Sequence, residues 1–140
     1  MIIARIQYYL DGRLFEWTFS GGAFWLGMST LVWPESITTG AFTQLVSVMS
    51  PGVVAAYALA VSIAGFAALL TNGRSLVWGP IVRSICATGR AYLWSQMAYA
   101  LFLVGMTRPT PSIGLGFWAV FAAAELYVAF RAMVDVKRNI

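Results

Sequence analysis

Four long runs of predominantly apolar residues follow one another along the chain: Leu14 to Trp33, Val53 to Thr71, Arg83 to Met106 and Ile113 to Met133. Each run has about the 20 residues with which an α-helix crosses roughly 30 Å of hydrocarbon at 1.5 Å per residue. Segments that contain proline or glycine separate the runs. The pattern predicts an all-α fold in which residues 1–140 form a single transmembrane domain, an integral membrane four-helix bundle.

Residues 1–11 precede the first run and carry apolar side chains at nearly helical spacing. These are Ile2, Ile3, Ile6 and Leu10. This spacing favours a short amphipathic helix in the membrane interface. A β-hairpin that turns at Asp11 and Gly12 is the alternative, but its open edge could not face hydrocarbon.

Residues 37–50 lie between the first two runs and also have one apolar face. Phe42, Leu45, Val46 and Met49 recur at helical spacing, opposite Thr43, Gln44, Ser47 and Ser50. We therefore expect an amphipathic helix that lies flat on the outer membrane surface. Ser50 and Pro51 then provide a helix cap and a first-turn proline for the second span.

The composition supports lipid as the solvent of this chain. Hydrophobic residues make up 60% of it and charged residues only 10%, whereas soluble domains average roughly 25% charged residues. A soluble bundle of four such helices would lack the polar residues to cover its surface. The chain has no histidine and one cysteine, Cys86, which excludes a histidine-based catalytic triad, the usual Cys/His metal sites and an intramolecular disulfide. We expect no enzymatic activity and no cofactor.

Eight of the nine basic side chains fall on one side when the chain is threaded four times through a bilayer. Only Arg108 falls on the other side. Because cytoplasmic segments carry the excess of arginine and lysine, both termini are expected in the cytoplasm. The basic residues are dispersed among segments that flank the spans. They therefore indicate contact with anionic lipid rather than with nucleic acid.

Arg90 and Glu125 are the charged residues that lie well inside the predicted spans rather than near their ends. If the third and fourth spans form an antiparallel hairpin, Glu125 lies about one turn from Arg90, and Asp135 lies next to Arg83. A lone carboxylate in hydrocarbon is unfavourable, so Glu125 should be paired, protonated or in contact with water. Two interpretations remain open: a structural clamp between Arg90 and Glu125, or a proton or cation path that uses Glu125.

The other charged residues near the ends of the spans are expected in the interface. Glu16 is close to the inner end of the first span, where it can reach lipid headgroups or Arg13. Arg131 and Asp135 are four residues apart on one helix, which is the spacing of an ordinary interfacial ion pair. Arg83 completes this interfacial set.

Small residues recur at every fourth position of the second span: Gly52, Ala56, Ala60, Ala64 and Ala68. In lipid, helices associate where small residues let their backbones approach closely. This small-residue stripe therefore predicts a packing surface. Packing within the chain is favoured, and packing between copies in a homo-oligomer is the alternative.

The stretch from Ala124 to Asp135 resembles the closing segment of small membrane proteins encoded by tailed bacteriophages. The order of Asn72-Gly73-Arg74, Pro80, Arg83 and Trp94 adds to the resemblance. The resemblance implies a phage origin and insertion in the host inner membrane, where holins and superinfection-exclusion proteins are the main known roles of such products. It transfers no catalytic residue.

These observations lead to one expected function and two alternatives. We expect a non-enzymatic phage-type membrane protein that oligomerises and permeabilises the membrane as a holin does. One alternative is a small proton- or cation-coupled transporter or channel component that uses Arg90 and Glu125. The other is a superinfection-exclusion or structural membrane protein.

Overall fold

The computed structural model describes residues 13–38, 40–71, 78–107 and 113–138 of the chain. Four helices in these residues are long: α2 (Leu14–Val32), α5 (Pro51–Leu70), α6 (Trp78–Met106) and α7 (Ile113–Arg138). Three short ones connect α2 to α5, namely α3 (Glu35–Thr38), the 3-10 helix η1 (Gly40–Phe42) and α4 (Thr43–Val48). All regular structure within the described residues is helical, so the predicted all-α class is confirmed there.

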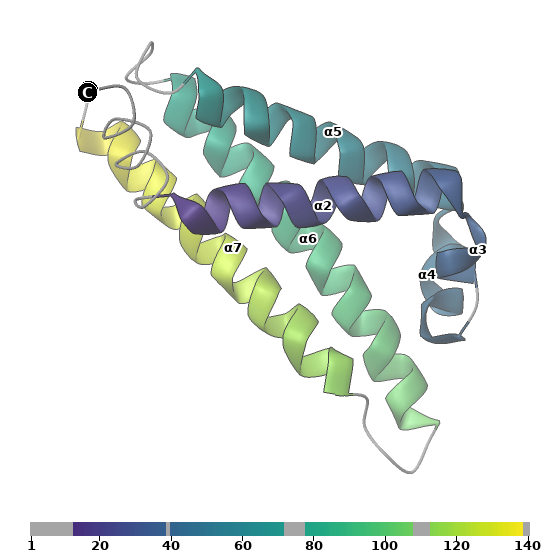
Figure 1. The fold of residues 1–140 in the computed structure, drawn as a ribbon. Helices are drawn as coiled ribbons and strands as arrows, with labels where there is room; N and C mark the ends of the chain where they lie inside the picture. Colours follow the sequence, from purple (N-terminus) through teal and green to yellow (C-terminus); the bar gives the residue numbers. More distant parts are fainter. Residues whose placement is uncertain (1–12, 39, 72–77, 108–112, 139–140) are drawn as a thin grey trace.

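The long helices form two antiparallel pairs that cross each other (Figure 1). In one pair α2 packs along α5, and in the other α6 packs along α7. At one end of the molecule the start of α2 and the end of α5 lie near the start of α6 and the end of α7. This end carries Arg13, Arg83, Arg131 and Lys137, and we call it the basic end. Away from it the two pairs diverge.

The ends of the long helices follow local signals in the sequence. The hydroxyl of Ser50 accepts a hydrogen bond from the backbone N–H of Val53 at 3.4 Å, and Pro51 occupies the first helical turn of α5. α2 ends at Val32, just before Trp33 and Pro34. α6 begins at Trp78 rather than at Arg83, and its 29 residues extend about 43 Å at 1.5 Å per residue. It is therefore longer than the hydrocarbon layer requires.

The connector between α2 and α5 differs from the single helix expected over residues 37–50. It is divided into α3, η1 and α4, and Gly40, the first residue of η1, has a positive φ of 69°. Its apolar face is the predicted one, because Leu45 is buried and the other three residues pack against the core: Phe42, Val46 and Met49. This face packs on the protein rather than on an outer membrane surface, since α4 and η1 lie against α6.

The main core lies where the two helix pairs meet. Trp94 of α6 is its largest aromatic residue and stacks on Trp118 of α7 with ring centroids 5.3 Å apart. Phe121 meets both rings edge-on. Small residues such as Ala23 and Ala58 let α2 and α5 approach this cluster closely. The core therefore fixes the position of α6 relative to the other long helices.

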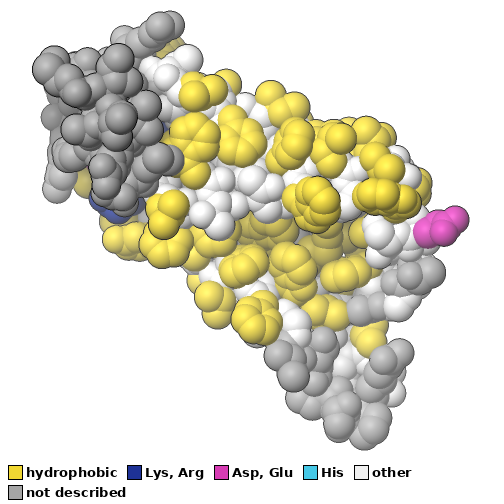
Figure 2. Space-filling view, in the orientation of Figure 1, with side chains coloured by type: hydrophobic (Ala, Val, Ile, Leu, Met, Phe, Trp, Pro, Cys, Tyr) yellow, Lys and Arg dark blue, Asp and Glu magenta, His cyan; other side chains and the backbone are white. Residues whose placement is uncertain are grey.

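The outer surface of the described residues is strongly apolar. Large hydrophobic side chains cover the face in Figure 2, and charged groups are visible only toward its ends. Phe15 and Trp25 of α2 and Leu70 of α5 are each at least 70% exposed, and Ile85 and Phe130 extend this surface over α6 and α7. By length and composition two helical segments, Pro51–Leu70 and Gly114–Lys137, are apolar enough to cross a membrane. α2 and α6 do not meet the same criterion.

Several sequence expectations concern residues outside the described ranges. These are the interfacial segment 1–11 with its hairpin alternative, and the side chains of Arg5, Arg74 and Arg108. They stay predictions.

Candidate functional site

Arg90 of α6 and Glu125 of α7 form a doubly hydrogen-bonded ion pair inside the molecule. The guanidinium Nη2 donates to Oε2 of Glu125 at 3.0 Å, and Nε donates to Oε1. The Arg90 side chain is 2% exposed and the Glu125 side chain 0%. Two parallel N–H···O bonds match the planar fork of a guanidinium, which makes this the strongest geometry for such a pair. The structure brings together the two residues for which the hairpin register predicted proximity.

The remaining guanidinium nitrogen of Arg90 faces the other helix pair. Its Nη1 donates to the hydroxyl of Ser20 on α2 at 3.0 Å. The same Nη1 lies 2.6 Å from the point that a Cβ on Gly65 of α5 would occupy, and the Ser20 hydroxyl oxygen lies 2.9 Å from that point. Real Cβ atoms do not approach other heavy atoms so closely, so glycine leaves the space that the guanidinium fills. Arg90 therefore lies at the meeting point of all four long helices.

A second buried cluster lies nearer the basic end, around Arg83 of α6. Its Nε donates to Oε2 of Glu16 at 2.7 Å and its Nη2 donates to Oε1 of the same carboxylate. Its Nη1 lies 3.7 Å from Oδ2 of Asp135 on α7. The side chain of Arg83 is 5% exposed, that of Glu16 is 11% exposed and that of Asp135 is 36% exposed. Arg83 of α6 thus lies between the Glu16 carboxylate of α2 and the Asp135 carboxylate of α7.

Helical spacing aligns these groups along the inside of the bundle. Glu16 and Ser20 are four residues apart on α2, so they lie on the same face one turn apart. Arg83 and Arg90 are seven residues apart on α6, which is two turns along one face. The Glu16 and Ser20 face of α2 therefore meets the arginine face of α6. The result is a buried polar line that runs from the basic end to the centre of the molecule.

The structure corrects the expectation for Glu16. Its carboxylate was expected to turn toward lipid headgroups or Arg13, but it is buried and bound by Arg83. The reason is that α2 crosses the α6–α7 pair at this depth, which the order of residues within α2 does not reveal. Arg131, another member of the expected interfacial set, is exposed on α7.

The small-residue stripe of α5 mostly faces away from the rest of the chain. Its members Gly52, Ala56 and Ala60 are exposed, Ala64 is half-buried and Ala68 is buried. The side of α5 that packs within the chain carries other small residues: Ala55, Ala58, Ser62 and Gly65. Packing of the stripe within the chain was the favoured interpretation. In the structure only the end of the stripe near Ala68 packs in this way.

Two residues that lie against the guanidinium of Arg90 were not identified from the sequence. Ser20 lies one turn after Glu16 on the same face of α2, and this spacing was the signal that it shares the environment of Glu16. Gly65 gave no such signal, because α5 contains many small residues and nothing in their spacing marks the one that faces Arg90.

The polar line holds charged groups that neutralise one another. Arginine does not deprotonate in proteins, so neither Arg83 nor Arg90 can serve as a general base. The hydroxyl of Ser20 accepts a hydrogen bond from Arg90, which does not activate it as a nucleophile. Mutual neutralisation of buried charges is what the geometry accomplishes.

Comparison of the chain with models of known protein families, with curated proteins and with solved structures gives no match.

Proposed function

We propose that this chain is a four-span inner-membrane protein of bacteriophage type, without enzymatic activity, whose copies associate and permeabilise the membrane as holins do. Both termini are then cytoplasmic, with the basic end at the cytoplasmic leaflet. The observation that carries the membrane part of this proposal is the inverted distribution of side chains: four charged side chains are buried inside the bundle, and many large hydrophobic side chains are exposed outside it.

The inverted distribution favours lipid over water as the surrounding solvent. Glu16, Arg83, Arg90 and Glu125 are all buried, whereas the long helices expose Phe, Trp and Leu side chains. In water this arrangement would leave a large apolar surface uncovered and would forgo hydration of four charges. In hydrocarbon the same arrangement is favourable, because buried charges pair with one another and apolar side chains face the acyl chains.

The same distribution explains why α2 and α6 contain no 18-residue stretch as apolar as those in α5 and α7. Six of their polar residues turn inward: Glu16, Ser20 and Thr30 on α2, and Arg83, Ser84 and Arg90 on α6. An average over the whole helix includes these inward residues and so understates the apolarity of the lipid-facing side. This supports the inclusion of α2 and α6 among the four spans.

Association between copies is supported by the exposed part of the small-residue stripe. Gly52, Ala56 and Ala60 present little side-chain bulk on the outward face of α5, where a helix of a second copy could approach closely. Because the charges of each subunit are neutralised internally, subunits can accumulate in the bilayer as apolar units. Assembly of the accumulated subunits would then open a hole in the membrane.

The test is induced expression in a bacterial host, with membrane potential followed by a voltage-sensitive dye. The proposal expects normal growth during accumulation and then an abrupt loss of potential after a delay. The matched control is Ala60→Leu, which keeps the fold and blocks close approach on α5. Intact potential with the protein fully inserted would contradict permeabilisation and would favour an exclusion or structural role.

A second candidate function is proton- or cation-coupled transport, and the enclosure of Glu125 favours it. This carboxylate lies where the polar line ends at the centre of the molecule, and it is 0% exposed. Transport would require Glu125 to exchange Arg90 for a proton or cation during each cycle. Flux into liposomes that depends on pH and is abolished in Glu125→Gln, without dissipation of the potential in cells, would support this function over permeabilisation.

A further inference from the structure

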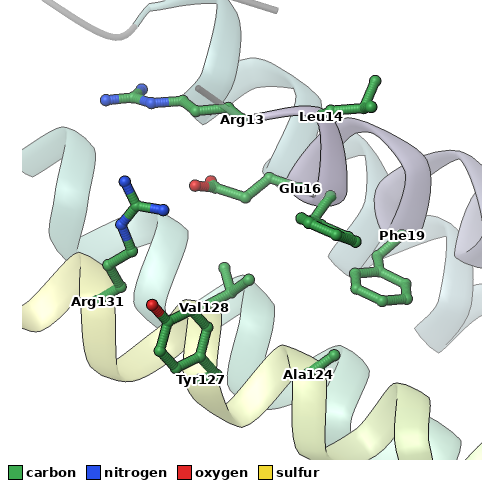
Figure 3. A pocket seen from close by; sticks show the side chains of 9 residues that line it. Arg13, Leu14, Glu16, Phe19, Ala124, Tyr127, Val128 and Arg131 are labelled. Carbon is green, nitrogen blue, oxygen red and sulfur yellow. The ribbon is translucent and has the colours of Figure 1, made fainter. Parts of the chain in front are cut away.

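A pocket of about 230 Å³ lies between the short helix α4 and the second half of α6. Its polar members are neutral: Gln44 of α4 and Tyr92, Gln96 and Tyr99 of α6. The larger pocket between α2 and α7, of about 480 Å³, differs in this respect, because charged side chains of both helices line it (Figure 3). The pocket beside α4 therefore offers hydrogen bonds without charge.

The side-chain amide of Gln96 makes no hydrogen bond to another described residue. It carries two N–H donors and an oxygen acceptor. Gln96 is half-buried and lies ten residues before Met106, the last residue of α6, which is about 15 Å along the helix. In the proposed topology this depth is within the hydrocarbon, where a polar group without a partner is unfavourable. A partner from outside the chain would satisfy the amide.

The surface around Gln96 continues from α6 onto α5. Tyr92 and Tyr99 lie four residues before and three residues after Gln96, and they are 47% and 56% exposed. Tyr92 meets Tyr57 of α5 with ring centroids 6.1 Å apart. Tyr57 is three residues before Ala60, so the two are neighbours on the surface of α5. The face around Gln96 therefore adjoins the exposed part of the small-residue stripe.

We propose that this face binds the same face of a second copy of the chain, with the two Gln96 amides hydrogen-bonded to each other. The inference deepens the proposed function and rests on its membrane embedding and on its association of copies. Two copies with one topology in one membrane are related by a two-fold axis along the membrane normal, so equivalent residues lie at equal depth.

The amide suits this symmetry because it both donates and accepts. Two facing Gln96 side chains can therefore form two reciprocal N–H···O bonds. Glutamine side chains that bond across helices stabilise helix association in membranes. A lipid acyl chain offers no donor or acceptor, and so it leaves the amide unsatisfied. The second copy is thus the occupant that meets the need of Gln96 at its own depth.

The test measures association of the full-length chain in liposomes, by energy transfer between copies that carry a donor or an acceptor at Lys137→Cys. Gln96→Met keeps the length of the side chain and removes the amide. It should raise the dissociation constant roughly threefold to thirtyfold, the range that hydrogen bonds between membrane helices supply. Wild-type association of Gln96→Met would overturn the proposal.

Two controls separate the contact between copies from effects within one chain. Gln44→Met removes the other amide of the pocket and should leave association unchanged, so an equal loss in this variant would overturn the proposal. Gln96→Met should also leave the unfolding midpoint of the monomer in detergent unchanged, because the amide has no partner within the described chain. A lower midpoint would assign the amide an internal role and contradict the contact.

Oxidative crosslinking in membranes tests the proximity directly. Tyr99→Cys places a thiol next to the proposed axis and keeps Gln96, and it should give a disulfide-linked dimer. Phe117→Cys is the matched control on α7, since Phe117 is 63% exposed. More dimer from Phe117→Cys than from Tyr99→Cys would overturn the proposal.

The failure of this inference can be distinguished from failure of the proposed function. If Gln96→Met associates and permeabilises as the wild type does, only the contact through Gln96 is contradicted. If the wild-type chain stays monomeric at every ratio of protein to lipid, the association in the proposed function is contradicted as well.

Discussion

The guanidinium group of Arg90 fills the space that a side chain on Gly65 would need, since Nη1 lies 2.6 Å from the position of a Cβ there. The two residues belong to different helix pairs, and this contact lies next to the hydrogen bond from Arg90 to Ser20. The absence of a side chain on α5 thus determines how closely the α2–α5 pair can approach the ion pair of α6 and α7.

Gly65→Ala should therefore destabilise the protein by about 1–3 kcal/mol, the usual range for overpacking a tightly packed interior. The guanidinium cannot simply move aside, because Glu125 and Ser20 hold it. Gly21→Ala is the matched control, since no atom lies within 4 Å of its added Cβ. The measurement is thermal unfolding in detergent followed by tryptophan fluorescence. Equal melting temperatures for the two variants would contradict the tight contact at Gly65.

Removal of either partner of the Arg90–Glu125 pair should destabilise the fold by about 3–5 kcal/mol, because the other charge is left buried and uncompensated. The double variant Arg90→Gln with Glu125→Gln should recover part of the sum of the two losses. A double-mutant cycle from unfolding in detergent measures this coupling. Arg90→Gln combined with Lys137→Gln serves as the control and should be additive. Strict additivity in both cycles would count against direct pairing.

The cluster around Arg83 should give a graded series of losses. Arg83→Gln leaves two carboxylates without their common partner and should be the most harmful, at about 3 kcal/mol or more. Glu16→Gln should be intermediate. Asp135→Asn should change stability by less than about 1 kcal/mol, since its oxygen is 3.7 Å from Arg83 and the side chain is 36% exposed. Unfolding midpoints of the three variants in one detergent test this order, and an Asp135→Asn loss as large as that of Arg83→Gln would reject it.

The proposed topology can be tested with thiol labelling, because the native Cys86 is buried and gives a low background. Ser36→Cys, Thr107→Cys and Lys137→Cys each place a thiol at an exposed position. A membrane-impermeant reagent should label Ser36→Cys and Thr107→Cys in intact spheroplasts, because the basic end stays in the cytoplasm. Lys137→Cys should react only after permeabilisation. Labelling of Ser36→Cys and Thr107→Cys from opposite sides would rule out four spans.

Ala60→Leu should weaken association between copies without loss of the fold, because Ala60 is exposed at the centre of the small-residue stripe. Ala58→Leu is the contrasting variant, since Ala58 is 0% exposed and a larger side chain there should disrupt the subunit itself. Ala119→Leu tests an exposed alanine on α7 as an alternative contact. Crosslinking in membranes reports association. If Ala60→Leu crosslinks like the wild type while Ala119→Leu does not, α7 rather than α5 forms the contact.

The sequence was most informative where neighbouring elements are joined by a short connection. α6 and α7 are such a pair, so a simple register placed Arg90 near Glu125 and Asp135 near Arg83. The start of α5 was equally predictable, because Ser50 caps the helix and Pro51 is its first residue. In these cases the interacting residues are fixed by local geometry.

The sequence was less informative where the two helix pairs meet. The crossing that brings Glu16 to Arg83 and Gly65 to Arg90 depends on side chains of four helices at once. The connector is divided near Gly40, whose positive φ starts η1 in a conformation that an α-helix does not allow. The stripe on α5 could not be assigned to a side, because the inward face is also rich in small residues.

The order in which the chain is synthesised gives the Glu16–Arg83 contact a consequence for insertion. The two residues are 67 positions apart, so α2 emerges with its acid well before α6 supplies the cation. Until then α2 lacks the charge that neutralises Glu16 in the finished bundle. A polypeptide that stops after α5 would keep that acid without its partner, so in the proposed topology the later half of the chain would secure the earlier half in the bilayer.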